Sequence, residues 1–72
     1  MQSTTTSSEE YMNRIKYYRE YYGMSQRQLA MYAKISNVEV NYIESGKHTP
    51  SVYKAIRIAK VLKVPVEKLF FE

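Results

Sequence analysis

Signals for the start of a helix recur along this chain of 72 residues and constrain its fold more than any other feature. In a capping box, a Ser side chain accepts a hydrogen bond from the backbone N–H three residues later, and a Glu or Gln at that position reaches back to the Ser backbone. The pattern occurs at Ser7 with Glu10, Ser25 with Gln28, and Ser36 with Glu39. Each occurrence predicts that a helix begins there.

Signals for the end of a helix lie at matching distances. Gly23 and Gly46 stand where a left-handed C-terminal cap would close the first and third helices. Pro50 and Ser51 open a fourth helix, and Pro65, which suits a first helical turn, begins a fifth. No segment alternates between apolar and polar residues as a half-buried strand does. The sequence therefore predicts a compact all-α fold of five helices, over residues 9–22, 26–33, 37–45, 52–63 and 66–71.

The predicted core follows from the same helical spacing. In the fourth helix, apolar residues recur at intervals of three and four, as one buried stripe requires. That stripe consists of Val52, Ala55, Ile56, Ala59 and Leu62. Along the whole chain, the residues expected inside are Ile15, Tyr18, Leu29, Ala30, Ala33, Val40, Ile43, Val52, Ile56, Ala59, Leu62, Leu69 and Phe70, with Met24 and Ile35 filling the turns.

Length limits the chain to one domain, because 72 residues can bury only one core. We place this domain at residues 9–72, after a polar, uncharged stretch at residues 1–8 that we interpret as a flexible arm. The arm lacks the basic and apolar regions of a signal peptide. No apolar run approaches the roughly 20 residues that cross a bilayer. We therefore expect a cytoplasmic protein that does not bind membranes.

Charge and side-chain chemistry narrow the function. The formal net charge is +4 and the pI is about 9.4, which favours an anionic partner such as nucleic acid, although many small domains are mildly basic. One His, no Cys, no cluster of carboxylates and no phosphate-binding glycine loop argue against an enzyme. We predict no catalytic residue, no metal site, no cofactor and no small-molecule ligand.

Residues 25–46 carry the clearest functional signal. A short helix, a tight turn and a second short helix follow one another there, and Ala30 and Ala33 are small enough to let the helices approach closely, which is helix-turn-helix geometry. The segments around this unit are Ile15 to Arg19, Gly23-Met-Ser-Gln26, Leu29-Ala30, Ile35-Ser-Asn-Val-Glu-Val-Asn-Tyr-Ile-Glu-Ser-Gly-Lys47, Pro50-Ser51, Ile58-Ala-Lys-Val-Leu62 and Val66-Glu-Lys-Leu-Phe70. With these segments the chain resembles the lambda-repressor-like, Cro/C1-type (Xre) helix-turn-helix family, over about residues 11–71 without insertion or gap.

The resemblance implies that the second helix of the unit lies in the major groove of DNA, with its outward side chains against base edges. Helical geometry turns Val40 and Ile43 inward and four other residues outward together. These candidate base-reading residues are Asn37, Val38, Asn41 and Tyr42. An Asn amide can pair with the major-groove edge of adenine, and Val can pack on the thymine methyl, so we expect an A·T-leaning half-site. The alternative is that both Asn residues are ordinary surface groups.

The resemblance also indicates which residues contact phosphates, which fix the register of the protein on DNA without reading its sequence. These residues are Ser25, Gln26, Arg27, Ser45 and Lys47, together with Lys34 and His48. Ser25 is also a predicted helix cap, and the two roles are compatible. Arg19 and Glu44 occupy positions that pair in relatives, which implies a structural ion pair here.

Two departures from the family pattern bear on affinity. The groove-facing helix carries Val38 and the acidic Glu39, with no basic residue from 37 to 45, and Ser45 stands where relatives usually have Asn. Near phosphates Glu39 is unfavourable unless it caps its helix or accepts a hydrogen bond from a cytosine amino group. Because phosphate neutralisation supplies much of the binding free energy, we expect reduced affinity.

Eight tyrosines exceed what the core needs. Exposed Tyr supplies large contact area at interfaces, although Tyr can also simply cover the rim of a core. Tyr17 and Tyr21 share a face of the first helix that the core does not use, and family members commonly dimerise through the last helix or the loop before it. The candidate interface residues are Tyr17, Tyr21, Val61, Val64 and Phe71. A homodimer would place two recognition helices one DNA turn apart, ~34 Å, on a pseudo-palindromic operator.

Two function classes stay open. The intact helix-turn-helix favours a sequence-specific transcriptional regulator that binds a double-stranded DNA operator, such as a phage Cro-like or Xre-type repressor. The surplus of tyrosine and the uncharged groove face favour a protein-binding module of the same fold, an antirepressor or antitoxin that pairs with a second repressor or a toxin.

Overall fold

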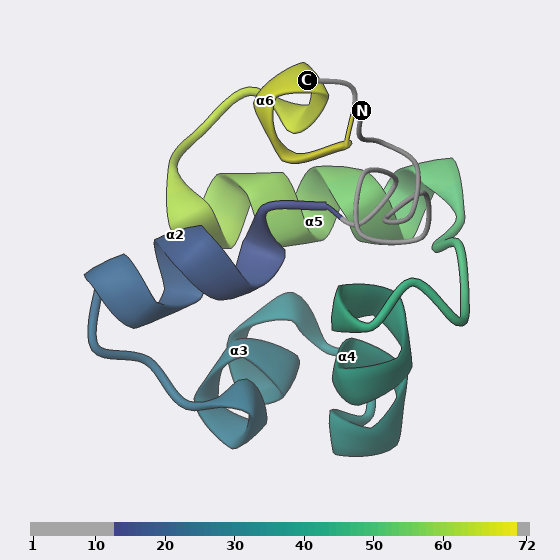
Figure 1. Cartoon of the computed structure of the whole chain (residues 1–72), viewed down its shortest axis with the longest axis horizontal. Helices are drawn as coiled ribbons and strands as arrows, with labels where there is room; N and C mark the ends of the chain where they lie inside the picture. Colours follow the sequence, from purple (N-terminus) through teal and green to yellow (C-terminus); the bar gives the residue numbers. More distant parts are fainter. Residues whose placement is uncertain (1–12, 71–72) are drawn as a thin grey trace, which may run out of the picture.

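The computed structural model describes residues 13–70. These residues form five helices, α2 (Ile15–Tyr21), α3 (Gln26–Ala33), α4 (Asn37–Glu44), α5 (Val52–Leu62) and α6 (Val66–Phe70), and no strand occurs among them (Figure 1). The all-α prediction is confirmed, and α3, α4, α5 and α6 begin at the predicted residues. The predicted arm at residues 1–8 and the capping box of Ser7 with Glu10 lie outside the described part of the chain.

Within the predicted first helix, 9–22, the described residues Asn13 and Arg14 are not helical, and α2 begins at Ile15. The side-chain oxygen of Asn13 accepts a hydrogen bond from the backbone N–H of Ile15 at 3.1 Å, and its amide nitrogen donates to the carbonyl of Ile43 at 2.7 Å. The backbone N–H of Arg14 donates to the carbonyl of Leu69 at 2.9 Å. These long-range bonds hold the residues before α2 against the ends of α4 and α6, so the helix starts only after them.

Serine residues cap the next three helices. The Ser25 hydroxyl accepts from the N–H of Gln28 and the Gln28 side chain accepts from the N–H of Ser25, which completes the predicted capping box. Ser36 caps α4 through the N–H of Glu39, and Ser51 caps α5. The predicted box of Ser36 with Glu39 is only half formed, because the Glu39 carboxylate binds side chains from elsewhere in the fold.

The same pair of backbone hydrogen bonds closes α2, α3, α4 and α5. In each, two successive N–H groups after the helix donate back to carbonyls of its last turn, which is the Schellman arrangement and requires a left-handed residue. Gly23 (φ 70°) and Gly46 (φ 81°) supply it as predicted, whereas Lys34 and Lys63, both at φ 62°, supply it after α3 and α5. A left-handed lysine is strained by its Cβ atom, so these two positions had no local sequence signal.

The core contains most of the predicted residues. Its fully or nearly fully buried apolar members are Ile15, Leu29, Ala30, Ala33, Val40, Ile43, Ile58, Ala59, Leu62 and Leu69. The prediction was wrong for Val52, which is 70% exposed, and for Ile56, which is 39% exposed, while Ile58 is fully buried. The apolar positions of α5 allow two stripes rotated against each other, and packing on the neighbouring helices selects the stripe that contains Ile58.

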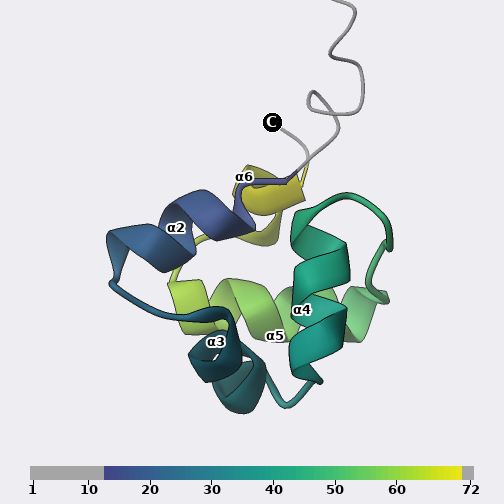
Figure 2. The same cartoon turned by 60° about the horizontal axis from the view of Figure 1, so that its bottom comes forward.

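Helix α5 lies in the middle of the molecule and packs against α2, α3 and α6. In Figure 1, α6 covers one side of α5, and α3 and α4 lie together on the opposite side. Figure 2 shows the same pair from another direction, with α4 standing across α5 and α3 beside it. Within residues 13–70, no helix is long and apolar enough to cross a membrane. The arrangement leaves the outer surface of α3 and α4 free of other described helices.

Candidate nucleic-acid interface

Helices α3 and α4 form a helix-turn-helix. Ala30 and Ala33 of α3 are buried against Val40 and Ile43 of α4, and the small alanines permit close helix packing. The turn between them contains the left-handed Lys34 and ends at the Ser36 cap. Because a serine hydroxyl at each helix start accepts a hydrogen bond from a backbone N–H, both α3 and α4 are fixed from their first turn.

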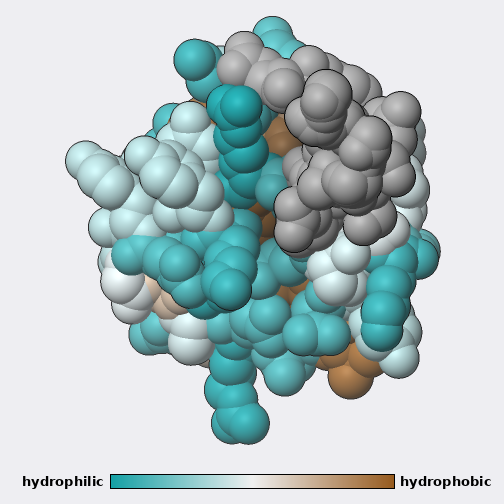
Figure 3. Space-filling model, viewed as in Figure 1, coloured by the Kyte–Doolittle hydropathy of each residue, from teal (hydrophilic) through white to brown (hydrophobic). Residues whose placement is uncertain are grey.

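The outward side of α4 is a neutral surface. Asn37, Val38, Asn41 and Tyr42 are all exposed, whereas Val40 and Ile43 on the opposite side are buried. We call these four residues the reading face. Figure 3 shows mostly hydrophilic surface at this end of the molecule, with a small hydrophobic patch over α4. The face offers two amides, a phenol and an apolar side chain, which is the chemistry that base edges in the major groove can pair with.

A buried ion pair anchors the C-terminal end of α4. Arg19 of α2 donates to both oxygens of Glu44, from Nε at 2.5 Å and from Nη2 at 3.1 Å, and its Nη1 donates to the Met24 carbonyl at 2.8 Å. Gln26 of α3 donates to Glu44 at 3.0 Å. The hydrogen bond to Glu44 raises the pKa of Arg19 above its ordinary value. The expected pair thus links α2, α3 and α4.

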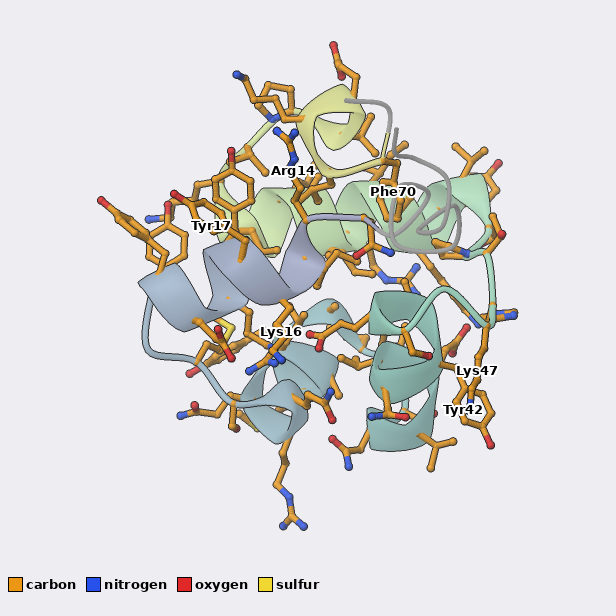
Figure 4. The ribbon with its side chains drawn as sticks, viewed as in Figure 1. Arg14, Lys16, Tyr17, Tyr42, Lys47 and Phe70 are labelled. Carbon is orange, nitrogen blue, oxygen red and sulfur yellow. The ribbon has the colours of Figure 1, made fainter. Side chains whose placement is uncertain are left out.

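The turn after α4 places a cation beside the reading face. Gly46 allows the N–H of Lys47 to donate to the carbonyl of Tyr42 at 2.9 Å. The Lys47 ammonium then lies 5.7 Å from the centre of the Tyr42 ring, and the two side chains extend together from this end of α4 in Figure 4. The cation–π contact holds Lys47 at the edge of a surface that has no basic residue of its own.

Glu39, in the first turn of α4, is held by two other segments. Lys54 of α5 donates to its oxygens at 3.1 and 2.9 Å, and Nε2 of His48 lies 3.2 Å from one of them. The hydrogen bond from Lys54, together with the charges of Lys54 and His48, lowers the pKa of Glu39. The acidic group that was unfavourable near phosphates is therefore ionised but paired.

The predicted phosphate-contacting residues differ in how free their side chains are. The hydroxyl of Ser25 caps α3, the amide nitrogen of Gln26 is bonded to Glu44, and the hydroxyl of Ser45 donates to the Tyr42 carbonyl. Arg27 and Lys34 are exposed. His48 is engaged with Glu39. With Lys47, which lies against the Tyr42 ring, all seven come from α3 or from the turns that flank α3 and α4.

Three residues that hold the site together were not predicted from the sequence. Asn13 bonds the Ile43 carbonyl near the end of α4, Lys54 binds Glu39, and Arg57 of α5 donates to the Ala33 carbonyl at the end of α3 at 2.8 Å. Each partner is 15 to 30 residues away in the chain. Packing of α5 behind the helix-turn-helix brings Lys54 and Arg57 to their partners, and the segment before α2 brings Asn13 to Ile43.

Comparisons with known proteins agree with this geometry. The sequence profile of the helix-turn-helix family matches residues 15–69. The chain is 38% identical over 58 residues to a protein of Methanocaldococcus jannaschii named as an HTH-type transcriptional regulator, covering 81% of this chain and 88% of that one. A protein of Archaeoglobus fulgidus with the same description is 37% identical over 57 residues, covering 79% and 81%. The crystal structure of the restriction-modification controller protein C.AhdI from Aeromonas hydrophila is similar with a TM-score of 0.75 and 26% identity, covering 79% and 86%.

Proposed function

We propose that this chain, which belongs to the Cro/C1-type helix-turn-helix family, is a DNA-binding transcriptional regulator whose helix α4 lies in the major groove. The observation that carries the proposal is the reading face, because four outward residues of α4 stay free of core contacts while both ends of the helix are fixed by side-chain bonds. The regulators and the controller protein to which the chain is similar support the same function.

The reading face selects bases by hydrogen bonds and apolar contact. Asn37 and Asn41 each present a donor and an acceptor, which match the major-groove edge of adenine. Val38, which is 59% exposed, packs on a thymine methyl, and Tyr42 adds a hydroxyl at the border of the face. The operator half-site is accordingly rich in A·T pairs.

Phosphates are held around the reading face rather than within it. The N-terminus of α3, which begins at the Ser25 cap, presents backbone N–H groups and the positive end of a helix dipole. Arg27, Lys34 and Lys47 add positive charge on exposed side chains. These groups orient the protein on the duplex and account for a salt-dependent affinity.

A homodimer then reads a pseudo-palindromic operator. The dimer forms through an apolar groove of about 430 Å³ between α5 and α6, where Val52 and Ile56 are exposed beside Val66 and Phe70. The interface predicted from the sequence, at Tyr17, Tyr21, Val61, Val64 and Phe71, stays a second candidate. Val61 and Val64 pack partly against the core, and Phe71 lies outside the described residues. Val52 and Ile56 therefore offer apolar area that no described residue covers fully.

Sedimentation of the protein with and without operator DNA checks the dimer. Ile56→Lys places a charge in the groove and yields a monomer with weaker operator binding. Tyr17→Ser/Tyr21→Ser, which alters the other candidate interface, keeps the dimer. If the tyrosine variant is a monomer and Ile56→Lys stays a dimer, the interface lies on α2 instead.

Binding of duplex DNA at increasing salt tests the function. The affinity for the preferred duplex falls steeply between 50 and 200 mM salt, as release of counterions from phosphates requires. Lys47→Ala weakens binding to all sequences alike and reduces the slope of log K against log salt by about 1. Equal affinity for every duplex at every salt concentration would contradict the proposal.

Exposed tyrosines on α2 favour a second function, binding to another protein. Tyr17 and Tyr21 are 64% and 73% exposed, and Tyr22 packs edge to face on Tyr21. Figure 4 shows Tyr17 on the side of the molecule away from Tyr42 and Lys47. A second repressor or a toxin bound there would leave the reading face free. Loss of partner binding in Tyr17→Ser/Tyr21→Ser, with DNA binding unchanged, is the result expected for such a role.

A further inference from the structure

The N-terminal turn of α4 carries an acidic residue that the reading face does not use. Glu39 is partly buried, with 17% of its side chain exposed, and both carboxylate oxygens accept hydrogen bonds from the Lys54 ammonium. His48, in the loop between α4 and α5, lies against the same carboxylate. Two cationic or proton-donating groups from outside α4 therefore determine where this carboxylate points.

The direction in which the Glu39 carboxylate points matters because of where Glu39 lies on the helix. At 100° per residue, Glu39 lies on the flank of α4 next to Tyr42, at the border of the reading face. A carboxylate released from Lys54 there would have two effects on DNA. It would repel the phosphates, and it could accept a hydrogen bond from the N4 amino group of a cytosine in the major groove.

Resting on the proposed function, we propose that Lys54 is a positioning residue that determines base specificity without touching DNA. Lys54 neutralises the Glu39 carboxylate and turns it toward α5. The carboxylate then accepts no hydrogen bond from a cytosine amino group. His48 supports the same orientation from the loop. The Asn residues and Val38 then select the half-site without competition from an acidic group.

Base preference in Lys54→Met tests the proposal. The probes are the duplex that the wild-type protein selects from a randomised pool and all single-base-pair variants of that duplex. Lys54→Met lowers affinity for all of them about three- to tenfold through phosphate repulsion. It also raises the relative preference for C·G at one position of each half-site by about fivefold or more. Lys54→Met/His48→Gln removes both holding groups and gives the larger change of the two.

Two further variants separate specificity from folding and from charge. Lys54→Met/Glu39→Gln removes the carboxylate and returns both affinity and base preference to the wild-type pattern. Lys60→Met, which removes the same charge from an exposed position of α5, leaves base preference unchanged. A thermal melt establishes that each variant is folded. A merely structural Lys54 would lower stability and affinity without moving the preferred base.

The outcomes distinguish this inference from the proposed function. Selection of a defined site by the wild-type protein, with an unchanged base profile in Lys54→Met and in Lys54→Met/His48→Gln, would overturn the role of Lys54 alone. Failure of Glu39→Gln to reverse the effect of Lys54→Met would also overturn it. If the wild-type protein selects no site, both the function and this inference fail.

Discussion

Helix α4 carries a glutamate near each end, and the two are held in different ways. Glu44, at the C-terminal end, is buried with Arg19, and their side chains are only 5% and 9% exposed. Glu39, in the first turn, is bonded to Lys54, whose side chain is 38% exposed. A buried, bidentate pair leaves a costly unpaired charge when one partner is lost, whereas a partly exposed pair is largely compensated by water. The first pair therefore fixes the fold, and the second sets the charge beside the reading face.

The largest effect is expected from breaking the buried pair. Arg19→Ala leaves Glu44 buried without its bidentate partner and lowers the free energy of unfolding by about 3–5 kcal/mol. Thermal or urea unfolding measures this loss. Lys16→Ala, at an exposed position of the same helix, is the control and unfolds like the wild type. If Arg19→Ala melts like the wild type, the buried pair contributes no more to the free energy of unfolding than the exposed pair.

A smaller effect on stability is expected from the exposed pair. Lys54→Met leaves Glu39 close to water, so the free energy of unfolding falls by less than about 1 kcal/mol. Urea unfolding at neutral pH provides the value. A loss as large as that of Arg19→Ala would mean that Lys54 belongs to the structural framework, and the distinction between the two ends of α4 would no longer hold.

The smallest effect is the pH dependence of the exposed pair. Lys54 and His48 lower the pKa of Glu39, so the stabilisation from its charged form is fully present above the ordinary glutamate pKa of about 4.3. It is lost as pH falls through the lower pKa of the folded state. The stability difference between the wild type and Glu39→Gln therefore shrinks as the pH falls below the ordinary glutamate pKa. A difference that stays the same or grows over that acidic range contradicts this assignment.

Local signals made most of the fold predictable. Ser25 and Ser36 cap their helices, and Gly23 and Gly46 adopt left-handed conformations, because these residue types satisfy backbone groups at helix ends through nearby atoms. The pattern that marks Ser36 and Glu39 as a capping box was only half right. The Glu39 side chain has a charged partner on another helix, and an ion pair there competes with the backbone N–H.

Features set by tertiary packing could not be predicted. Helix α5 has apolar residues on more than one face, so its spacing alone does not decide between Ile56 and Ile58 as the buried residue. Lys34 and Lys63 take left-handed conformations that lysine itself disfavours, and the fold imposes them. The reading face could be placed, because the inward positions of α4 are unambiguous. The groups that hold it, Asn13 and Lys54, come from distant segments.

The central claim is that the exposed side of α4 reads the bases of an operator. The most direct test is selection of duplexes from a randomised pool by the wild-type protein and by Asn37→Ala/Asn41→Ala, followed by sequencing of the bound fraction. The account predicts a pseudo-palindrome with A·T-rich half-sites for the wild type, and loss of preference at those positions in the variant, with sequence-independent binding retained. A variant that selects the same operator with the same stringency would contradict it.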